Sequence, residues 1–188
     1  MDGYAGQTRY YHLRAAEYDR GAWESEHPEV ARLIDVVTGL APARTLDVGC
    51  GTGFLSQYLR GELTLLDASE DMLAIAAERM LAATLVHAEA PPLPFANGAF
   101  ERVFSSHFYD HLLPAERRSF LAEARRVAPE LVLVQQRGDT HWEGPERRTL
   151  EDGSEHEIYK TYFTAESLLA EVGGEVLDEG PTFLVVRS

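Results

Sequence analysis

A glycine-rich turn directly after a short apolar run is the feature that most constrains how this chain folds. The segment reads TLDVGCGTGFL, with glycines at positions 49, 51 and 53 and Asp47 two residues before the first glycine. The apolar run at 44–48 predicts a strand, and the spacing of apolar residues over 54–59 predicts a helix after the turn. Glycines lack Cβ atoms, so a ligand can approach the backbone, and the N–H groups of the predicted helix would face the same point. The pattern is typical of a strand–turn–helix unit that binds a ligand at the carboxyl edge of an α/β sheet.

The spacing of these glycines excludes two common phosphate-binding loops. A P-loop requires a lysine after its last glycine, and the only lysine of the chain is Lys160. A dinucleotide-binding loop has the spacing G-x-G-x-x-G, but here Phe54 occupies the position of the third glycine. Asp47 would repel a pyrophosphate and would favour an ammonium group, reached directly or through water. The loop therefore predicts a ligand that carries a positive charge near Asp47.

A second carboxylate specifies the ligand further. The segment LTLLDAS places Asp67 at the end of the next predicted strand. A carboxylate at that position accepts hydrogen bonds from the hydroxyl groups of a ribose. An acid for an ammonium group and an acid for a ribose together describe a site for S-adenosylmethionine.

At these motifs the sequence resembles the class I S-adenosylmethionine-dependent methyltransferases. LDVGCGTG is similar to the first motif of that family, and LLDASEDML is similar to the second. HAEAPPLPFANGAFERVFSS is similar to a later family segment, in which Glu89 and Glu101 stand where the family usually has Asp.

The resemblance also implies how the cofactor is held. Met72 would pack on the adenine, Glu89 would meet the adenine amino group, and the backbone around Gly49 and Ser105 would hold the methionine amino group. Two tyrosines of an N-terminal helical lid would close over the methionine end, although packing in the core is an alternative for both. The cofactor-binding residues expected from the motifs and the resemblance are Tyr11, Tyr18, Asp47, Gly49, Cys50, Gly51, Gly53, Asp67, Ala68, Met72, Glu89 and Ser105.

Strand-like runs alternate with helical stretches over most of the chain, which predicts a parallel sheet covered on both faces. The last two predicted strands, 175–177 and 182–186, are joined by the short turn DEGP, so they must be antiparallel. We expect an α/β fold, a Rossmann-like three-layer sandwich with a seven-stranded, mostly parallel sheet and an antiparallel C-terminal hairpin. The family fold places its last strand between the fifth and the sixth.

We expect one methyltransferase domain over residues 1–188. Its parts are an N-terminal helical region (1–40), a cofactor-binding core (41–136), an acceptor-side insertion (137–163) and a terminal helix with the hairpin (164–188). The Asp152-Gly153 pair within the insertion is typical of a hairpin turn.

Candidate acceptor contacts follow the fourth predicted strand and continue in the insertion. His107, within SSHFYDHL, is a candidate general base, although a structural role is equally compatible with its position. His111, Trp142 and Tyr159 are candidate substrate-binding residues, and packing of the hairpin is the alternative for Trp142. Arg147 and Arg148 are compatible with binding an anionic acceptor or with ion pairs to nearby acids.

Composition limits the partners. The formal net charge of −14 disfavours nucleic acid, and the single cysteine, Cys50, suits a reducing cytoplasm. No apolar run reaches the length of about 20 residues that spans a bilayer, and we expect no metal. We therefore expect methyl transfer from S-adenosyl-L-methionine to a small-molecule acceptor. The alternatives are a non-catalytic partner subunit that binds this cofactor and a dinucleotide-dependent oxidoreductase.

Overall fold

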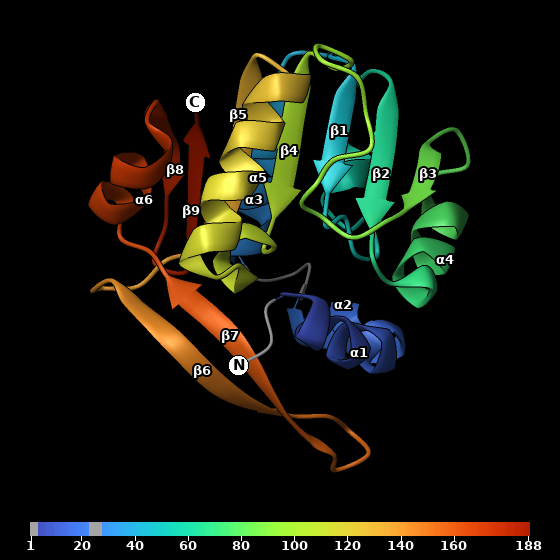
Figure 1. The fold of residues 1–188 in the computed structure, drawn as a ribbon, viewed down its shortest axis with the longest axis vertical. Helices are drawn as coiled ribbons and strands as arrows, with labels where there is room; N and C mark the ends of the chain where they lie inside the picture. Colours follow the sequence, from blue (N-terminus) through green and yellow to red (C-terminus); the bar gives the residue numbers. More distant parts are fainter. Residues whose placement is uncertain (1–3, 23–27) are drawn as a thin grey trace.

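The computed structural model describes residues 4–22 and 28–188 (Figure 1). One seven-stranded sheet forms the centre of the molecule, and a separate two-stranded hairpin lies beyond one end of it. The strands of the large sheet are β1 (Thr45–Val48), β2 (Leu63–Asp67), β3 (Thr84–His87), β4 (Arg102–Ser106), β5 (Glu130–Gln136), β8 (Glu175–Glu179) and β9 (Phe183–Arg187). The helices are α1 (Tyr4–Arg14), α2 (Tyr18–Ala22), α3 (Pro28–Gly39), α4 (Glu70–Arg79), α5 (Pro114–Val127) and α6 (Ala165–Val172), with single 3₁₀ turns η1 (Ala15–Glu17), η2 (Ser56–Tyr58) and η3 (Tyr109–His111).

The order of the strands confirms the fold expected from the sequence. The order is β3-β2-β1-β4-β5-β9-β8, and β1 to β5 run parallel. The last strand, β9, pairs antiparallel with both β5 and β8, so it is inserted between the fifth strand and the sixth. The carboxyl ends of β1, β2 and β4 therefore lie side by side at one edge of the sheet.

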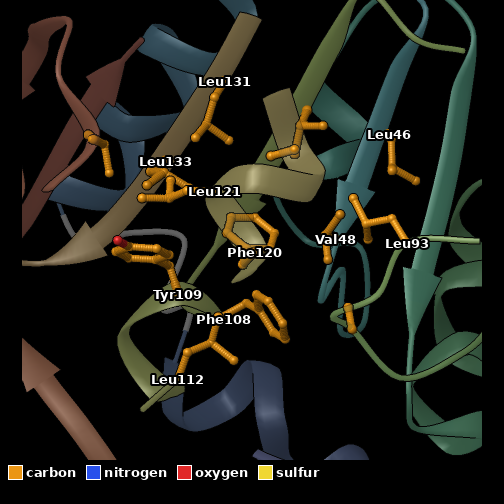
Figure 2. Close-up of a cluster of buried hydrophobic side chains, with 14 of the residues drawn as sticks. Leu46, Val48, Leu93, Phe108, Tyr109, Leu112, Phe120, Leu121, Leu131 and Leu133 are labelled. Atoms are coloured by element: carbon orange, nitrogen blue, oxygen red, sulfur yellow. The ribbon is translucent and has the colours of Figure 1, made fainter. Parts of the chain in front are cut away.

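Helices pack on both faces of this sheet, because successive strand residues point to opposite sides. In β5, Leu131 and Leu133 belong to the apolar cluster that also contains Phe120 and Leu121 of α5 (Figure 2). Val132, between them, joins the cluster on the other face, with apolar residues of α3. These two clusters make the three layers of the fold, with α5 and α3 on opposite faces (Figure 1).

The helix predicted after the glycine loop is wrong. The structure has only the 3₁₀ turn η2, held by bonds from the N–H of Tyr58 to the carbonyl of Leu55 and from Leu59 to Ser56. Leu59 is already extended, and Arg60 donates to the carbonyl of Leu40. Only residues 54–62 connect the loop to β2, and the chain must return to the start of a parallel strand. Extended residues cover about 3.3 Å each and helical residues about 1.5 Å, so this short connection is mostly non-helical.

The insertion forms a hairpin of β6 (Trp142–Thr149) and β7 (Glu155–Tyr162), with Asp152 and Gly153 in its turn, as the sequence predicts. It projects beyond the carboxyl edge of the sheet and meets the N-terminal helices (Figure 1). The buried Gln7 of α1 links the parts: its amide oxygen accepts from the N–H of Tyr159, and its amide nitrogen donates to the carbonyl of His111, both at 3.0 Å. Within residues 4–22 and 28–188, no helix is long and apolar enough to cross a membrane.

Candidate active site

The glycine loop leaves the end of β1 in backbone conformations that favour glycine. Gly49, Gly51 and Gly53 have φ angles of +69°, +54° and +71°. The N–H groups of Gly49 and Cys50 both donate to the carbonyl of Leu66, which fixes the loop beside the end of β2. A Cβ on Gly49 would lie 2.6 Å from the Cβ of Phe108, so no larger residue fits there. Because the three glycines lack side chains, the backbone at these positions can come close to whatever lies above it.

Asp47 is a buried carboxylate that is only half satisfied. Its Oδ2 accepts from the Ser56 hydroxyl at 2.5 Å, and its Oδ1 has no hydrogen-bond partner among the described residues. Burial raises the pKa of Asp47 to about 7, although the bond from Ser56 opposes this rise and the charge of Asp67 adds to it. A cation beside Oδ1 would compensate the desolvated charge.

Asp67 ends the neighbouring strand β2. Its Oδ2 accepts from the N–H of Gly51 and its Oδ1 from the N–H of Ser69, both at 2.8 Å. Burial raises the pKa of Asp67, and these two backbone bonds lower it. The two bonds orient the carboxylate beside the loop, and each oxygen keeps a further lone pair for a ligand.

Two small cavities of about 20 Å³ each flank the loop. Asp47 and Cys50 line the first, Asp67 and Met72 line the second, and Ser106 lines both. The Ser106 hydroxyl is buried and has no partner among the described residues. The neighbouring Ser105, whose backbone the resemblance places near the methionine amino group, donates its hydroxyl to the carbonyl of Val48 at 2.8 Å. Strand alternation separates the two serines, and only the register of β4 decides which of them faces the cavities.

The N-terminal helices cover these cavities. Tyr18 lines both of them, and Tyr11 lines the one beside Asp67. Asp19 attaches the N-terminal helices to the glycine loop and to α4, because its carboxylate accepts hydrogen bonds from the Thr52 hydroxyl and from the Arg79 guanidinium, both at 2.6 Å. The arrangement agrees with a lid over the glycine loop.

Other predicted cofactor residues lie at different distances from the loop cavities. Gly51 lines both cavities. Gly53 packs close to Met80 at the end of α4, because an added Cβ at Gly53 would meet the Met80 side chain. Ala68 is buried and its carbonyl lies 3.1 Å from the His87 ring, whereas the Glu89 side chain is exposed and outside the residues that line either cavity. Burial raises the pKa of the Cys50 thiol, which keeps it protonated and unreactive.

A larger cavity of about 280 Å³ lies next to the two tyrosines of the N-terminal helices, Tyr11 and Tyr18 (the lid tyrosines). This cavity shares three lining residues with the cavity beside Asp67, namely Tyr11, Tyr18 and His107. His107 follows the end of β4 with a φ of +53°, and its N–H donates to the carbonyl of Val134 at 2.9 Å. Burial lowers the pKa of His107, although Asp110 opposes the shift, so the imidazole is neutral near pH 7. The lining consists of Tyr11, Arg14, Tyr18, His107, His111, Gln136, Arg148, Ile158, Lys160, Thr182 and Phe183.

A buried ion pair supports the floor of this cavity. Lys160 Nζ lies 2.5 Å from Asp110 Oδ2, and both side chains are buried. Burial opposes the ionisation of Asp110, but the charge of Lys160 keeps its pKa well below the usual range. His111 is neutral, because burial and then Lys160 lower its pKa to about 3. Its Nδ1 lies 2.9 Å from the carbonyl of Tyr159 and must carry the proton, so Nε2 accepts from the Tyr11 hydroxyl.

Two predicted acceptor contacts lie outside the lining of this cavity. Trp142 is 43% exposed and packs on Tyr162, with ring centroids 5.9 Å apart. Tyr159 is buried and joins β7 to α1 and η3 through its backbone. The structure instead brings Arg14, Gln136 and Phe183 to the cavity. The sequence carries no local signal for these three, since they come from α1, β5 and β9.

Comparisons with known proteins agree with this geometry. Residues 45–130 match a family described as a methyltransferase domain. A malonyl-[acyl-carrier protein] O-methyltransferase of Geobacter sulfurreducens is 32% identical over 127 residues, which are 62% of this chain and 46% of that protein. A demethylmenaquinone methyltransferase of Thermotoga maritima is 30% identical over 101 residues, 51% of this chain and 43% of that protein. The chain thus matches less than half the length of either relative.

Solved structures show the same fold. A structure described as a DhpI-SAM-HEP complex has a TM-score of 0.81 and 23% identity, and the match covers 98% of this chain and 96% of that one. The Burkholderia thailandensis 1,6-didemethyltoxoflavin-N1-methyltransferase has a TM-score of 0.67 and 17% identity, with 98% and 87% covered. Residues 45–130 are thus similar to a methyltransferase domain, and the whole chain shares its fold with S-adenosylmethionine-dependent methyltransferases.

Proposed function

We propose that this protein binds S-adenosyl-L-methionine over the glycine loop and transfers its methyl group to a small-molecule acceptor. One observation carries the proposal: a buried, half-satisfied carboxylate, Asp47, lies under a loop in which three residues are glycines, next to a second buried carboxylate, Asp67. Burying two acids side by side is costly unless a cation and hydrogen-bond donors complete the site. An ammonium group and two ribose hydroxyls supply both.

Each residue then has a role toward the cofactor. Asp47 faces the ammonium group, and the Ser106 hydroxyl supplies a hydrogen bond from the same side. Asp67 accepts from the ribose, Met72 packs on the adenine, and the lid tyrosines exclude water. The bound cofactor would supply a sulfonium methyl group and a neutral thioether leaving group. The protein has only to align the acceptor with that methyl group, which contributes about 7–11 kcal/mol when two reactants are well oriented.

The acceptor side of the proposal rests on the cavity of about 280 Å³, which suits a small molecule. His107 lies between this cavity and the loop, so we propose that it contacts the reacting end of the acceptor. A neutral imidazole there accepts a proton from a hydroxyl or an amine, or donates a hydrogen bond to an acceptor that needs no base. The single cysteine and the net charge of −14 support a cytoplasmic protein that does not act on nucleic acid.

Titration calorimetry with S-adenosylmethionine, S-adenosylhomocysteine and NAD tests the proposal. We expect the two sulfur nucleosides to bind, and Asp47→Asn to weaken both. Binding of NAD alone would instead support an oxidoreductase. A screen of metabolite extracts for compounds that gain a methyl group then tests turnover, and binding without any such product would support a non-catalytic subunit.

A further inference from the structure

The lining of the cavity of about 280 Å³ is positively charged, although the chain as a whole is negatively charged. The protein has 31 Asp and Glu against 17 Lys and Arg. The cavity lining nevertheless contains the cations Arg14, Arg148 and Lys160 and, within the described part of the chain, no carboxylate. In so acidic a protein, three cations around one small cavity favour the binding of an anion there.

The three cations differ in how far their charges are already compensated. Lys160 forms an ion pair with the buried Asp110, and Arg148 forms one with Glu146 at 3.1 Å. Arg14 is different: its guanidinium lies over the Tyr18 ring at 4.8 Å and the Tyr10 ring at 5.8 Å. Among residues 4–22 and 28–188 no carboxylate lies within ion-pair distance of it. Stacking on rings leaves the N–H edge of a guanidinium available to a planar or tetrahedral oxyanion.

A second, outer cavity shows where the nearby acids lie. It has a volume of about 330 Å³ and shares Arg14 and Arg148 with the inner cavity. Glu17 and Glu151 line the outer cavity only, and Glu151 pairs with Arg20 there. The two shared arginines therefore stand at the boundary, and the space between them and His107 is free of carboxylate side chains.

From this arrangement we infer that the acceptor is a small oxyanion, a carboxylate or a phosphonate, held by Arg14 and Arg148 and methylated on oxygen. The inference rests on the proposed function and deepens it. Gln136 and Thr182 also line the cavity and supply neutral hydrogen-bonding groups. His107 lies on the cofactor side of the same cavity and donates a hydrogen bond to the reacting end of the oxyanion.

This acceptor class removes the need for a base. An oxygen lone pair of the acceptor forms the new O–C bond while the C–S bond of the cofactor breaks, and the bonding pair stays on sulfur. A carboxylate or a fully ionised phosphonate loses one negative charge, the sulfonium loses its positive charge, and no proton is released. A hydroxyl or protonated amine acceptor would release one proton in each turnover. Proton release therefore distinguishes the acceptor classes.

The first test is binding, measured on protein saturated with S-adenosylhomocysteine. Propionate and methylphosphonate are compared by ligand-observed NMR with their uncharged counterparts, propionamide and dimethyl methylphosphonate. We expect one or both anions to bind and the neutral probes to fail. We expect Arg14→Gln and Arg148→Gln each to weaken anion binding about tenfold or more, as for loss of a charge-assisted hydrogen bond. Arg9→Gln, on the exposed face of α1, is the matched control and retains binding.

Equal binding of neutral and anionic probes, no anion binding, or anion binding unchanged in both variants would overturn the inference. A larger response to propionate or to methylphosphonate identifies which oxyanion the site prefers. A methyl ester of propionate formed without proton release at about pH 8 supports the inference, as does a methyl ester of methylphosphonate formed with less than one proton released, because that anion is partly protonated there. A product from a hydroxyl or amine with proton release overturns it. If no probe is methylated, the binding comparison decides. Calorimetry with S-adenosylmethionine is run first, so failure of the proposed function is seen separately as loss of cofactor binding.

Discussion

Replacing Asp47 with asparagine tests the electrostatics of the cofactor site without any ligand. Burial raises the pKa of this carboxyl from 3.8 to about 7 in the folded protein, so between these values the folded state binds more protons than the unfolded state. The free energy of unfolding therefore falls as pH rises from about 4 to 7 and is level above that. A difference of about 3 pKa units at 1.36 kcal/mol each gives a total loss of about 4 kcal/mol. Asparagine cannot ionise and does not suffer this loss.

The substitution also has a structural cost, which a comparison of two pH values removes. The amide oxygen introduced by Asp47→Asn would still accept a hydrogen bond from Ser56. Its amide N–H groups would replace Oδ1, which has no partner among the described residues, and leaving them unpaired lowers the free energy of unfolding by about 1–3 kcal/mol at any pH. Between pH 5 and pH 8 the wild type loses about 2.7 kcal/mol through Asp47, because about 2 pKa units of the difference fall in that interval. We expect the stability of Asp47→Asn relative to wild type to rise by that amount.

Urea unfolding of the ligand-free proteins at pH 5 and pH 8 measures this difference. Asp35→Asn, which removes an exposed carboxylate of α3, controls for the change in net charge and should show no such rise. Calorimetry on the same variant should show S-adenosylmethionine affinity at least about tenfold weaker, since a charged hydrogen-bonding partner is lost. An equal effect of the substitution at both pH values, with unchanged cofactor affinity, would refute the reasoning for Asp47.

Further predictions concern the same regions. Asp67→Ala should weaken cofactor binding by about 1–3 kcal/mol in calorimetry, because charge-assisted hydrogen bonds to the ribose are lost. At pH 6, S-adenosylmethionine binding should release close to one proton from Asp47, which calorimetry in buffers of different ionisation enthalpy detects. The cofactor should protect the N-terminal helices against limited proteolysis, and Asp19→Ala should make them more sensitive in its absence, because it removes the anchor to Thr52 and Arg79. Equal cleavage in all cases would exclude a lid. Lys160→Met should lower the free energy of unfolding by about 3–5 kcal/mol in urea, since the buried Asp110 loses its partner.

The sheet was predictable because its signals are local. Ser69, a residue type favoured at N-caps, accepts from the N–H of Met72 and begins α4. The turn before β9 is too short for a crossover helix, so it required an antiparallel last strand. The failed helix after the glycine loop shows the limit of such signals. Its apolar spacing fits a helix, but the length of the connection to β2 decides the backbone, and a local pattern contains no such length constraint.

That Asp47 and Asp67 lie close together was predictable for a related reason. Asp47 and Asp67 each end a strand, and adjacent parallel strands bring their carboxyl ends to one edge of a sheet. Ser106 was not among the expected residues, because only the register of β4 places it beside the loop cavities. In the structure the Ser105 hydroxyl donates to the carbonyl of Val48, whereas the Ser106 hydroxyl has no partner among the described residues.

The acceptor cavity depends on contacts that no sequence window contains. Arg14, Arg148 and Phe183 lie on α1, β6 and β9, and they reach one cavity only because the hairpin docks against the N-terminal helices. Gln7 fixes that docking by bonding both to Tyr159 of the hairpin and to the carbonyl that ends η3. In the sequence Gln7 reads as an ordinary polar residue of a helix. A residue without a recognisable motif thus decides which cations line the proposed acceptor cavity, which explains why the motifs predict a cofactor and leave the acceptor open.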